Sequence, residues 1–582
     1  MCAAWKAIVA AALAGCTAAP PTPDEQHAAT LAEWRDMRFG MFIHWGPVAL
    51  RGTEIGWSRG TQVPRAEYDA LGTRFDAPAF DPREWARVAK AAGMKYVVLT
   101  SKHHDGFCLW DSAVTEHDVM SSPLRRDVVG ELAAACRKEG LAFGLYYSIL
   151  DWYQPDYNTA GSQGGPGCAL SPGEAPSMDR YEAYLHTQLR ELAERYGPLL
   201  TFWFDGHWEE PWTIERGERL AAFCRDLDPR ILVNNRVGRA RPDASPPGDY
   251  GTPEQEIGAF DDERPWETCM TICRQWAWKP DDALKSREEC IRTLVKTAGG
   301  DGNLLLNVGL MPDGRIEPRQ ADRLREVGEW LAGNGESIYG TRGGPFYPGE
   351  WGASTHRGRL VYVHVFAWEE GERALPGLDQ RIVAAHRLGG GAVDFAQTDS
   401  LVTLRVPPAA QDPVNTIIVL ELAAPVRGHA RGSRVPTAFD RGEHGEWLSA
   451  HATYELSSRA PQWSRHEDRL LGGEDYPADF AFHTAEERDP WIAIDLGEPC
   501  AVRGLEIENR RNGFQERATG LTAWVSTDGE TWRPVWQAAE IRAKWEIVLD
   551  PPAAGARYVR IGRHAERDGY LHLYSVRVYG DR

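Results

Sequence analysis

The 582-residue sequence lacks several patterns that are typical of particular protein classes, such as metalloproteins and repeat proteins. It has no Cys-x-x-Cys pair, no His-Glu-x-x-His motif, no internal repeat and no long low-complexity tract. Lys and Arg are few, 65 against 84 Asp and Glu, which leaves a formal net charge of −19. This shortage of positive charge argues against nucleic acid or an acidic membrane surface as a partner. Without a cysteine framework, we interpret most of the 10 cysteines as buried thiols, with a disulfide or two as the alternative.

The sequence also lacks an apolar run long enough to cross a bilayer. The run after Lys6 has about 10 residues, the length of a secretory h-region, and ends in Leu-Ala-Gly-Cys. This tetrapeptide resembles the lipobox of bacterial lipoproteins, which implies a signal peptide over 1–16, lipidation of Cys16 and a flexible tether over 17–30. We expect a bacterial protein whose only membrane contact is a lipid anchor, at the periplasmic or outer surface. An ordinary signal peptide is the alternative.

Apolar runs and helical patterns alternate over residues 31–338. Near-continuous apolar strands separated by helices predict an α/β fold with a parallel sheet covered by helices, here a TIM-like barrel. The expected strands are 41–46, 96–102, 142–148, 199–206, 231–236 and 303–309, with weaker ones near 68–76 and 268–274. The expected helices are 83–92, 126–140, 179–196, 215–227, 284–298 and 318–333.

The pattern changes near Gly340. Period-2 runs at 359–368 and 415–422 predict a β-sandwich over 339–425. Further runs at 491–497, 521–532 and 557–563 predict a second β-sandwich over 440–582.

Polar and aromatic side chains gather at the ends of five predicted barrel strands, where the functional residues of such barrels lie. The strand ends read His44-Trp45-Gly46, His103-His104-Asp105-Gly106, Tyr146-Tyr147, Trp203-Phe204-Asp205-Gly206 and Asn234-Asn235-Arg236. A carboxylate at the end of an apolar strand needs a partner or a chemical role, because an unpaired buried charge is costly. The combination predicts a pocket that binds a sugar.

A metal site is the competing interpretation, since His44, His103, His104, Asp105 and Asp205 are all able to bind metal. Adjacent histidines on a strand point to opposite faces, so His103 and His104 converge only if the strand breaks there. We therefore expect neither a metal nor an organic cofactor.

Seven motifs in order over about 31–425 resemble the α-L-fucosidases of glycoside hydrolase family 29. They are RFGMFIHWGPVAL (38–50), EIGWSRG (54–60), TSKHHDGFCLWDS (100–112), FWFDG (202–206), GTPEQE (251–256), WETC (266–269) and NLLLNVG (303–309). The resemblance implies a retaining exo-α-L-fucosidase that acts on fucosylated glycans through a covalent fucosyl-aspartate.

The resemblance also implies residue roles. The nucleophile falls on Asp205, and fucose-binding residues fall on His44, Trp57, His103, His104, Tyr147, Trp203 and Arg236. Tyr146 is the alternative to Tyr147, and an aromatic wall is expected from Trp276 or Trp278. Retention requires a second carboxyl group about 5–5.5 Å from the first. Glu254 is our first choice for this acid/base and Glu267 the alternative, with a structural role beneath the pocket as the other interpretation of Glu267.

Residues 440–582 resemble a discoidin-like module, also called an F5/8 type C domain, and are similar to family 32 carbohydrate-binding modules. The resemblance rests on WIAIDLG (491–497), STDGETW (526–532), RYVRIGR (557–563) and YSVRVYG (574–580). It implies a jelly-roll sandwich that binds a sugar, with a purely structural module as the alternative. For the whole chain, the alternatives to a fucosidase are a galactose-accepting exo-glycosidase and an inactive fucose-binding lectin.

Overall fold

The computed structural model describes residues 20–582 except 158–164, 242–244, 259, 370, 431–436, 440–441, 461–462, 464–465, 473–478, 512 and 564–567. The predicted signal peptide and Cys16 lie outside the described residues. Within the described part, no helix has the length and apolar character needed to cross a membrane. The eight cysteines of this part are free thiols, and all but Cys168 are buried.

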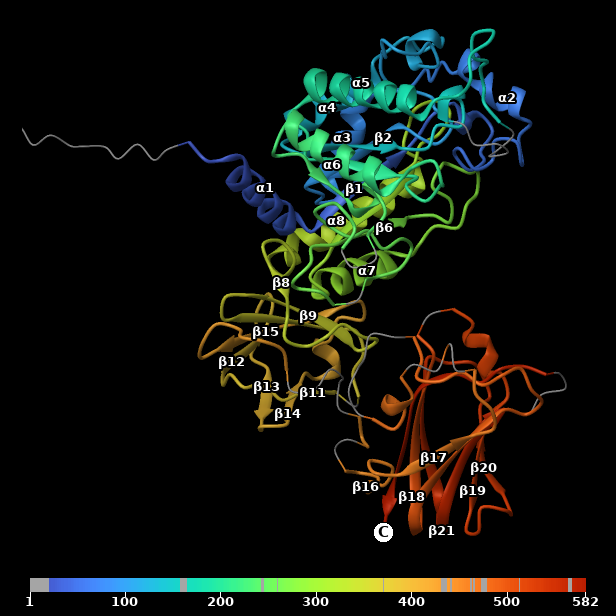
Figure 1. Ribbon diagram of the computed structural model, residues 1–582. Coiled ribbons are helices and arrows are strands. Elements are labelled where there is room, and N and C mark those ends of the chain that lie inside the picture. The colour runs from blue at the N-terminus through green and yellow to red at the C-terminus, as the bar shows by residue number, and fades with distance from the viewer. Residues whose placement is uncertain are drawn as a thin grey trace, which may run out of the picture.

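A curled, seven-stranded parallel sheet forms the first unit (Figure 1). Its strand order is β5-β4-β3-β2-β1-β7-β6. The strands are β1 (Phe39–His44), β2 (Tyr96–Lys102), β3 (Ala142–Ser148), β4 (Thr201–Asp205), β5 (Leu232–Val233), β6 (Glu267–Thr271) and β7 (Asn303–Gly309). The helices are α3 (Pro82–Ala91), α4 (Val128–Glu139), α5 (Met178–Tyr196), α6 (Ile214–Leu227), α7 (Arg287–Gly299) and α8 (Pro318–Asn334). This confirms the TIM-like fold, the six helices and the weak strand near 268–274.

The predicted strand at 68–76 is wrong. The segment forms helix α2 (Arg65–Asp69) and a 3₁₀ turn (Leu71–Arg74). Tyr68 and Leu71 are buried, and three residues apart is the spacing of one helical face, not of a strand. The sheet therefore has one strand fewer than a complete eight-stranded barrel.

The gap in the sheet lies between β5 and β6. No named strand fills it among the described residues, but the extended segment 250–254 makes single parallel bridges to both sides. Tyr250 bridges to Asn234, Gly251 to Trp266, and Glu254 to Cys269. The segment thus takes the place of a strand without regular pairing.

Helix α1 (Pro23–Met37) begins inside the predicted tether, which is therefore wrong from Pro23 onwards. A capping box supports its start, because Thr22 and Glu25 exchange hydrogen bonds. Near its end Trp34 is 1% exposed and packs on Tyr250, with ring centroids 4.5 Å apart. The helix thus docks on the barrel through a large buried side chain.

The second unit contains two antiparallel sheets, as predicted. A five-stranded sheet has the order β12-β15-β10-β9-β8 and a three-stranded sheet the order β11-β14-β13. The strands are β8 (Arg342–Gly343), β9 (Gly352–Arg357), β10 (Leu360–Val365), β11 (Glu372–Pro376), β12 (Ile382–Arg387), β13 (Asp394–Gln397), β14 (Leu401–Arg405) and β15 (Thr416–Leu422). Both faces of β10 are buried: Val361 and Val363 lie in the core of this unit, whereas Tyr362 lies in the core of the barrel.

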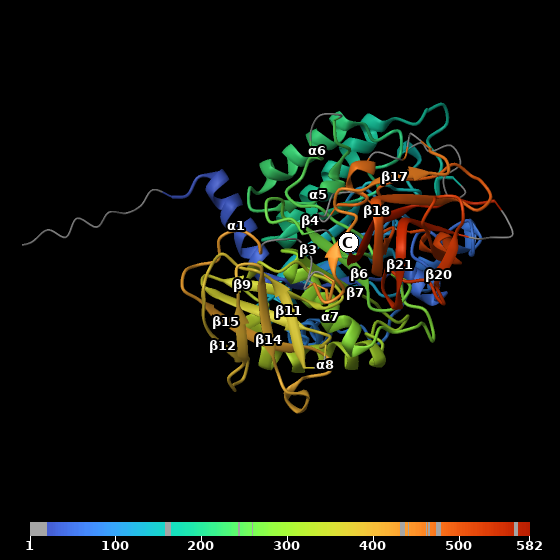
Figure 2. The same cartoon turned by 90° about the horizontal axis from the view of Figure 1, so that it is seen from below.

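The third unit is an antiparallel body of strands with a core cluster of its own. Figure 1 shows its strands apart from the barrel, and Figure 2 shows the same strands from below. Its main path is β16-β22-β18-β21-β19-β20, and β17 pairs with β18. The strands are β16 (Glu446–Trp447), β17 (Thr453–Leu456), β18 (Trp491–Asn509), β19 (Leu521–Ser526), β20 (Arg533–Gln537), β21 (Lys544–Arg563) and β22 (Leu573–Asp581). The predicted runs at 491–497 and 557–563 fall within β18 and β21, whereas the run at 521–532 coincides with β19 only as far as Ser526.

Candidate active site

The carboxyl ends of the barrel strands surround one pocket. Its lining comes from β1, β3, β4 and β6 and from the segments that follow β1, β2, β4, β5 and β6. The lining residues are Phe42, His44, Trp57, His103, Tyr146, Trp203, Asp205, Trp208, Arg236, Glu254, Cys269 and Trp276. Side chains from the five predicted strand ends therefore meet at one site.

Asp205 is the last residue of β4 and the central carboxylate of this pocket. Tyr146 donates a hydrogen bond to its Oδ2 over 3.1 Å, and Arg236 Nη1 lies 3.1 Å from its Oδ1. The chain then turns sharply at Gly206, which has φ +90° and approaches Leu150 so closely that a Cβ there would clash. The turn ends the strand at the carboxylate.

Opposing effects act on the pKa of Asp205. Burial alone would raise it, but the charge of Arg236, the proximity of His104 and hydrogen bonds from Arg236 and Tyr146 hold the pKa below its ordinary value. The carboxylate is therefore ionised at neutral pH, as a nucleophile requires.

Arg236 connects Asp205 to a second carboxylate. The same Nη1 atom lies 2.9 Å from Glu254 Oε2. Because both oxygens contact one nitrogen, at 3.1 and 2.9 Å, they lie no more than about 6 Å apart. Thr252 holds the guanidinium in this position, since it accepts hydrogen bonds from Nε at 2.9 Å and from Nη2 at 3.1 Å.

The backbone around Glu254 is fixed against β6. Cys269 N donates to Pro253 O over 3.1 Å, and Gln255 N donates to Cys269 O over 3.0 Å. The side chain of Glu254 is 40% exposed, on the open side of the pocket. A carboxyl group in this position has access to both Asp205 and solvent.

Glu267 has the electrostatic character of a general acid but lies in another place. Burial raises its pKa to about 7, although hydrogen bonds from Tyr96 and Trp203 act in the opposite direction. It is the first residue of β6, is 1% exposed and does not line the pocket. Trp203 Nε1 donates to it from above over 3.0 Å. Geometry precedes pKa for a proton donor, so this placement corrects the alternative assignment and fits a structural role beneath the pocket.

Three buried histidines line or support the site. Strand β2 ends at Lys102, so His103 and His104 leave the strand and lie together, with ring centroids 4.2 Å apart. His104 Nε2 lies 3.7 Å from Asp205 Oδ2. Burial lowers the pKa of His44 to about 3 and that of His104 to about 4, so both rings are neutral at pH 7.

The hydrogen bonds of His44 define its tautomer. Asn307 Nδ2 donates to Trp276 O, which leaves Asn307 Oδ1 to accept from His44 Nδ1 at 2.6 Å. His44 Nε2 is then an unprotonated acceptor. A substrate hydroxyl is the matching donor.

Of the two adjacent tyrosines, Tyr146 belongs to the pocket and Tyr147 does not. Tyr147 points to the outer face of the sheet, where its hydroxyl donates to Gln188 and Lys102 Nζ lies over its ring. The family-based choice of Tyr147 is therefore corrected to Tyr146. The reason is the strand period of two, because Tyr146 pairs with Trp203, which shares its face with Asp205.

Aromatic rings form the rest of the pocket. The ring centroids of Trp276 and His44 lie 4.9 Å apart. Trp278 does not line the pocket and lies near Gly52. At the open side of the pocket, Trp57 is 44% exposed and Trp208 is 43% exposed. Their rings stack on each other, with centroids 6.3 Å apart. Trp212, from the same loop as Trp208, is instead fully buried and donates to Val237 O.

Sequence reasoning missed Phe42 and Cys269 as lining residues. Phe42 precedes His44 by two positions and so shares its face of β1, a signal that the period of two contained. Cys269 carried no such signal, because its strand was only weakly predicted. Among the described residues, no group of three His, Cys, Asp or Glu side chains is placed to hold a metal ion.

Comparison with known proteins gives two family matches. The model of the family described as "Alpha-L-fucosidase" matches residues 9–336, and the model described as "F5/8 type C domain" matches residues 451–572. Tissue alpha-L-fucosidase of Homo sapiens is 33% identical over 389 residues, which is 61% of this chain and 80% of that protein. The alpha-L-fucosidase of Branchiostoma floridae is 32% identical over 350 residues, 55% of this chain and 75% of that protein.

Solved structures agree with the sequence matches. Alpha-L-fucosidase isoenzyme 1 from Paenibacillus thiaminolyticus superimposes with a TM-score of 0.62 and 35% identity, covering 68% of this chain and 99% of that one. A family 29 alpha-L-fucosidase from Bacteroides thetaiotaomicron, trapped as a covalent intermediate with a 2-fluoro-fucosyl compound, gives a TM-score of 0.61 and 29% identity. That match covers 68% of this chain and 96% of the Bacteroides chain.

Proposed function

Because this chain belongs to the α-L-fucosidase family and is a retaining glycoside hydrolase of terminal α-L-fucosyl linkages, we propose that Asp205 is its nucleophile and Glu254 its acid/base. The family matches favour this activity over the galactose-accepting enzyme and over the inactive lectin.

The observation that carries the assignment is the shared contact of both carboxylates with Arg236 Nη1. It limits their nearest oxygens to about 6 Å apart. Retaining enzymes need carboxyl groups about 5–5.5 Å apart, whereas inverting enzymes separate them by about 6.5–9.5 Å to admit a water molecule. Of the two candidate acids, Glu254 lines the pocket with Asp205 and Glu267 does not.

The reaction follows from these positions as a double displacement. Asp205 attacks the anomeric carbon while Glu254 gives its proton to the glycosidic oxygen, so the bond to the leaving glycan breaks and a fucosyl ester forms. Glu254 then takes a proton from water, whose oxygen attacks the same carbon and releases Asp205. Two inversions give net retention.

The other lining residues act on the sugar. Neutral imidazoles both donate and accept hydrogen bonds, which suits the hydroxyl groups of a sugar. His44 and His103 supply such groups, and Trp203 and Trp276 supply apolar faces. His104 is not part of the lining and lies beside Asp205, with Nδ1 2.6 Å from Ser148 Oγ. Trp57 and Trp208, exposed at the open side, are placed to contact the leaving part of the glycan.

The test compares an aryl α-L-fucoside with a fucosylated oligosaccharide in four variants. Asp205→Ala is expected to lose both activities and to regain aryl fucoside cleavage with azide, giving a product of inverted configuration. Glu254→Ala is expected to lose the oligosaccharide activity by about 10²–10⁴-fold more than the aryl activity, because an activated leaving group needs little protonation. Glu267→Ala and the exposed control Glu256→Ala are expected to show no such difference between substrates. Wild-type oligosaccharide hydrolysis by Glu254→Ala would overturn the assignment, as would the leaving-group effect appearing in Glu267→Ala.

We further propose that the chain is a lipid-anchored protein of a bacterial surface or periplasm. Support comes from the apolar run and the Leu-Ala-Gly-Cys sequence at 13–16. Labelling of the protein by a fatty-acid analogue, dependent on Cys16, is the corresponding measurement.

A further inference from the structure

The Trp276 wall of the barrel pocket belongs to the segment 272–286, which lies between β6 and α7 and forms neither helix nor strand. No ladder of backbone hydrogen bonds fixes such a segment, so its position depends on other contacts. Ala277 is 3% exposed and lies in one small apolar cluster with Ile55. The backbone after Trp276 also approaches Gly309, at the end of β7, so closely that a Cβ there would clash.

Glu54, which directly precedes Ile55, holds the backbone of this wall. Its Oε2 accepts a hydrogen bond from Trp276 N over 2.9 Å, and its Oε1 accepts from Ala277 N over 2.9 Å. Ile55 N donates to the same Oε1 over 3.1 Å. Both oxygens of one carboxylate thus bind two successive peptide N–H groups. Hydrogen bonds to an ionised acceptor are stronger than those between neutral groups.

These N–H groups are the counterpart of the Glu54 charge. Among the residues that the structure describes, no Lys, Arg or His side chain lies within ion-pair distance of this partly buried carboxylate. Burial raises the pKa of Glu54, the three backbone donors lower it, and the charge of Asp282 raises it further. A partly buried carboxylate without a cation is costly, and its hydrogen bonds to the wall offset that cost.

The same peptide connects Glu54 to His44. The carbonyl of Trp276 accepts from Asn307 Nδ2 over 2.8 Å, and Asn307 Oδ1 accepts from His44 Nδ1 over 2.6 Å. The direction of the Asn307 amide depends on that carbonyl, because an amide turned by half a rotation presents a donor to His44 instead. His44 would then carry its proton on Nε2 and lose the acceptor for a substrate hydroxyl.

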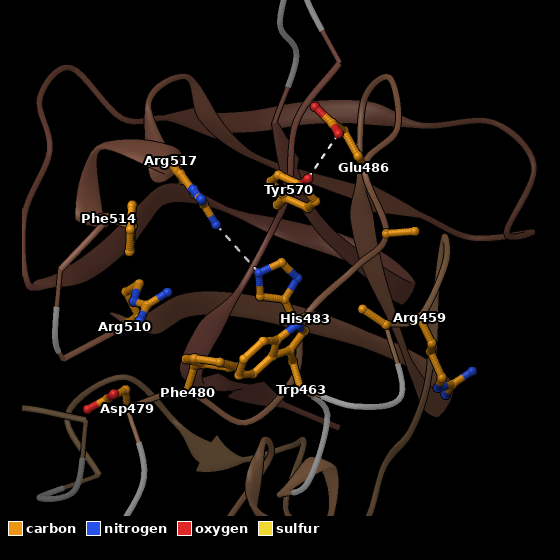
Figure 3. A pocket seen from close by; sticks show the side chains of 12 residues that line it. Arg459, Trp463, Asp479, Phe480, His483, Glu486, Arg510, Phe514, Arg517 and Tyr570 are labelled. Carbon is orange, nitrogen blue, oxygen red and sulfur yellow. Dashed lines mark hydrogen bonds between the residues drawn. The ribbon is translucent and has the colours of Figure 1, made fainter. Parts of the chain in front are cut away.

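Glu54 does not itself line the barrel pocket. The pocket of the F5/8 type C module differs in this respect, because the charged side chains of Arg510 and Arg517 line the same hollow as its aromatic rings (Figure 3). A charge in a lining can contact a ligand directly, whereas a charge outside it acts only through the residues that it holds. Glu54 is therefore a positioning residue.

We propose that Glu54 positions the sugar-binding wall, because its carboxylate holds the Trp276 backbone and, through it, both the Trp276 ring and the tautomer of His44. This inference rests on the proposed function, since it takes this pocket as the fucose site. Among the described residues, no hydrogen bond joins this network to Asp205 or Glu254. The effect of Glu54 therefore falls on sugar binding and not on proton transfer.

The test is Glu54→Gln, measured as kcat and KM for an aryl α-L-fucoside and as the inhibition constant of L-fucose. The amide has the shape of the carboxylate but only one accepting atom, so its NH₂ group faces one of the backbone N–H groups. We expect KM and the inhibition constant to rise together by about tenfold, the effect of a buried donor left unpaired. We expect kcat to change by less than about twofold. A smaller fraction of folded protein would instead lower kcat and leave both constants unchanged.

Glu191→Gln is the matched control. Glu191 also accepts from a tryptophan and from a backbone N–H, Trp110 Nε1 and Ala113 N, each over 2.9 Å, but none of these residues lines the pocket. Its KM and inhibition constant are expected to stay at wild-type values. Asn307→Ala removes the next link of the network and is expected to raise both constants, which keeps the proposal testable if Glu54→Gln does not fold.

A double-mutant cycle with His44→Ala shows whether Glu54 acts through that ring. Glu54→Gln is expected to raise KM less in the His44→Ala background than in the wild type. Equal rises in both backgrounds would overturn the proposal, as would wild-type constants in Glu54→Gln. Asp205→Ala separates the two levels: if it is inactive while Glu54→Gln binds normally, the positioning role alone fails, whereas an active Asp205→Ala rejects the proposed function itself.

Discussion

At the scale of single residues, Arg236 is the link between the two carboxylates of the active site. Its pKa would be lowered by burial, but Asp205, Cys269 and Glu254 raise it above the ordinary value, so the group is always charged. The Arg236 guanidinium also lies over the Trp203 ring, with Cζ 4.9 Å from the ring centroid. Arg236 therefore sets both the position of Glu254 and the charge state of Asp205.

This link predicts a shift in the pH profile. Asp205 reacts as the anion, so activity on an aryl fucoside falls as the pH drops through its pKa, which lies below the ordinary 3.8. In Arg236→Met the positive charge is lost while burial remains, so the pKa rises and the acidic limb of kcat/KM moves to higher pH. Arg236→Lys keeps a charge and is expected to shift the limb less. An acidic limb that stays in place in Arg236→Met would contradict this account.

At the scale of elements, helix α1 closes the barrel at the end opposite to the active site. Trp34 lies among side chains of the barrel interior, together with Leu200, Tyr250 and Leu305. His27, one turn after the start of α1, contacts Pro229 O at 2.9 Å and Asp249 Oδ1 at 3.0 Å. Asp249 directly precedes the segment 250–254 that carries Glu254, so the helix supports the irregular part of the sheet.

Truncating the side chain of Trp34 is therefore expected to destabilise the barrel. Trp34→Ala removes a fully buried indole and leaves a cavity, at a cost of about 3–5 kcal/mol. The adjacent exposed residue serves as control, since Glu33→Ala is expected to change stability by less than about 0.5 kcal/mol. Urea unfolding, followed by loss of aryl fucoside hydrolysis, measures both. Equal midpoints for the two variants would show that α1 does not contribute to the barrel.

At the scale of the whole molecule, the three units differ in how they share their cores. The barrel core includes Ala353, Tyr362, Phe366, Ile417 and Val419 from the second unit. The third unit instead has a core cluster of its own. The barrel and the second unit thus share one hydrophobic core. The F5/8 type C module has a separate hydrophobic core, which is the feature that lets a domain fold independently.

Two truncations test this division. A chain that ends after Ala430, whose amide donates to Pro345 O, retains the complete second unit and is expected to stay soluble and to hydrolyse an aryl fucoside normally. A chain that ends after residue 338 exposes the apolar face of the barrel that the second unit covers, and is expected to aggregate. Size-exclusion chromatography and activity give the readout. An active, monodisperse product of the shorter truncation would contradict the shared core.

The sequence by itself determined the order of the elements, the parallel sheet and the carboxylate at the end of β4. These features depend on local periodicity and on short motifs, which involve residues close together in the sequence. The α-L-fucosidase motifs added the activity, and family matches confirm it. The sequence did not predict helix α1, because the Pro-rich segment at its start resembled a flexible tether. Thr22 and Glu25 nevertheless form a capping box there.

Only the tertiary structure decided between neighbouring candidates. Tyr146 and Tyr147 differ by one position, yet the strand places one in the pocket and the other against Gln188. Glu254 and Glu267 lie 13 positions apart, yet only Glu254 reaches Arg236, because the gap between β5 and β6 lets an irregular segment cross the pocket. The direction of a side chain and the meeting of distant segments depend on strand register and chain closure, which no single stretch of sequence contains.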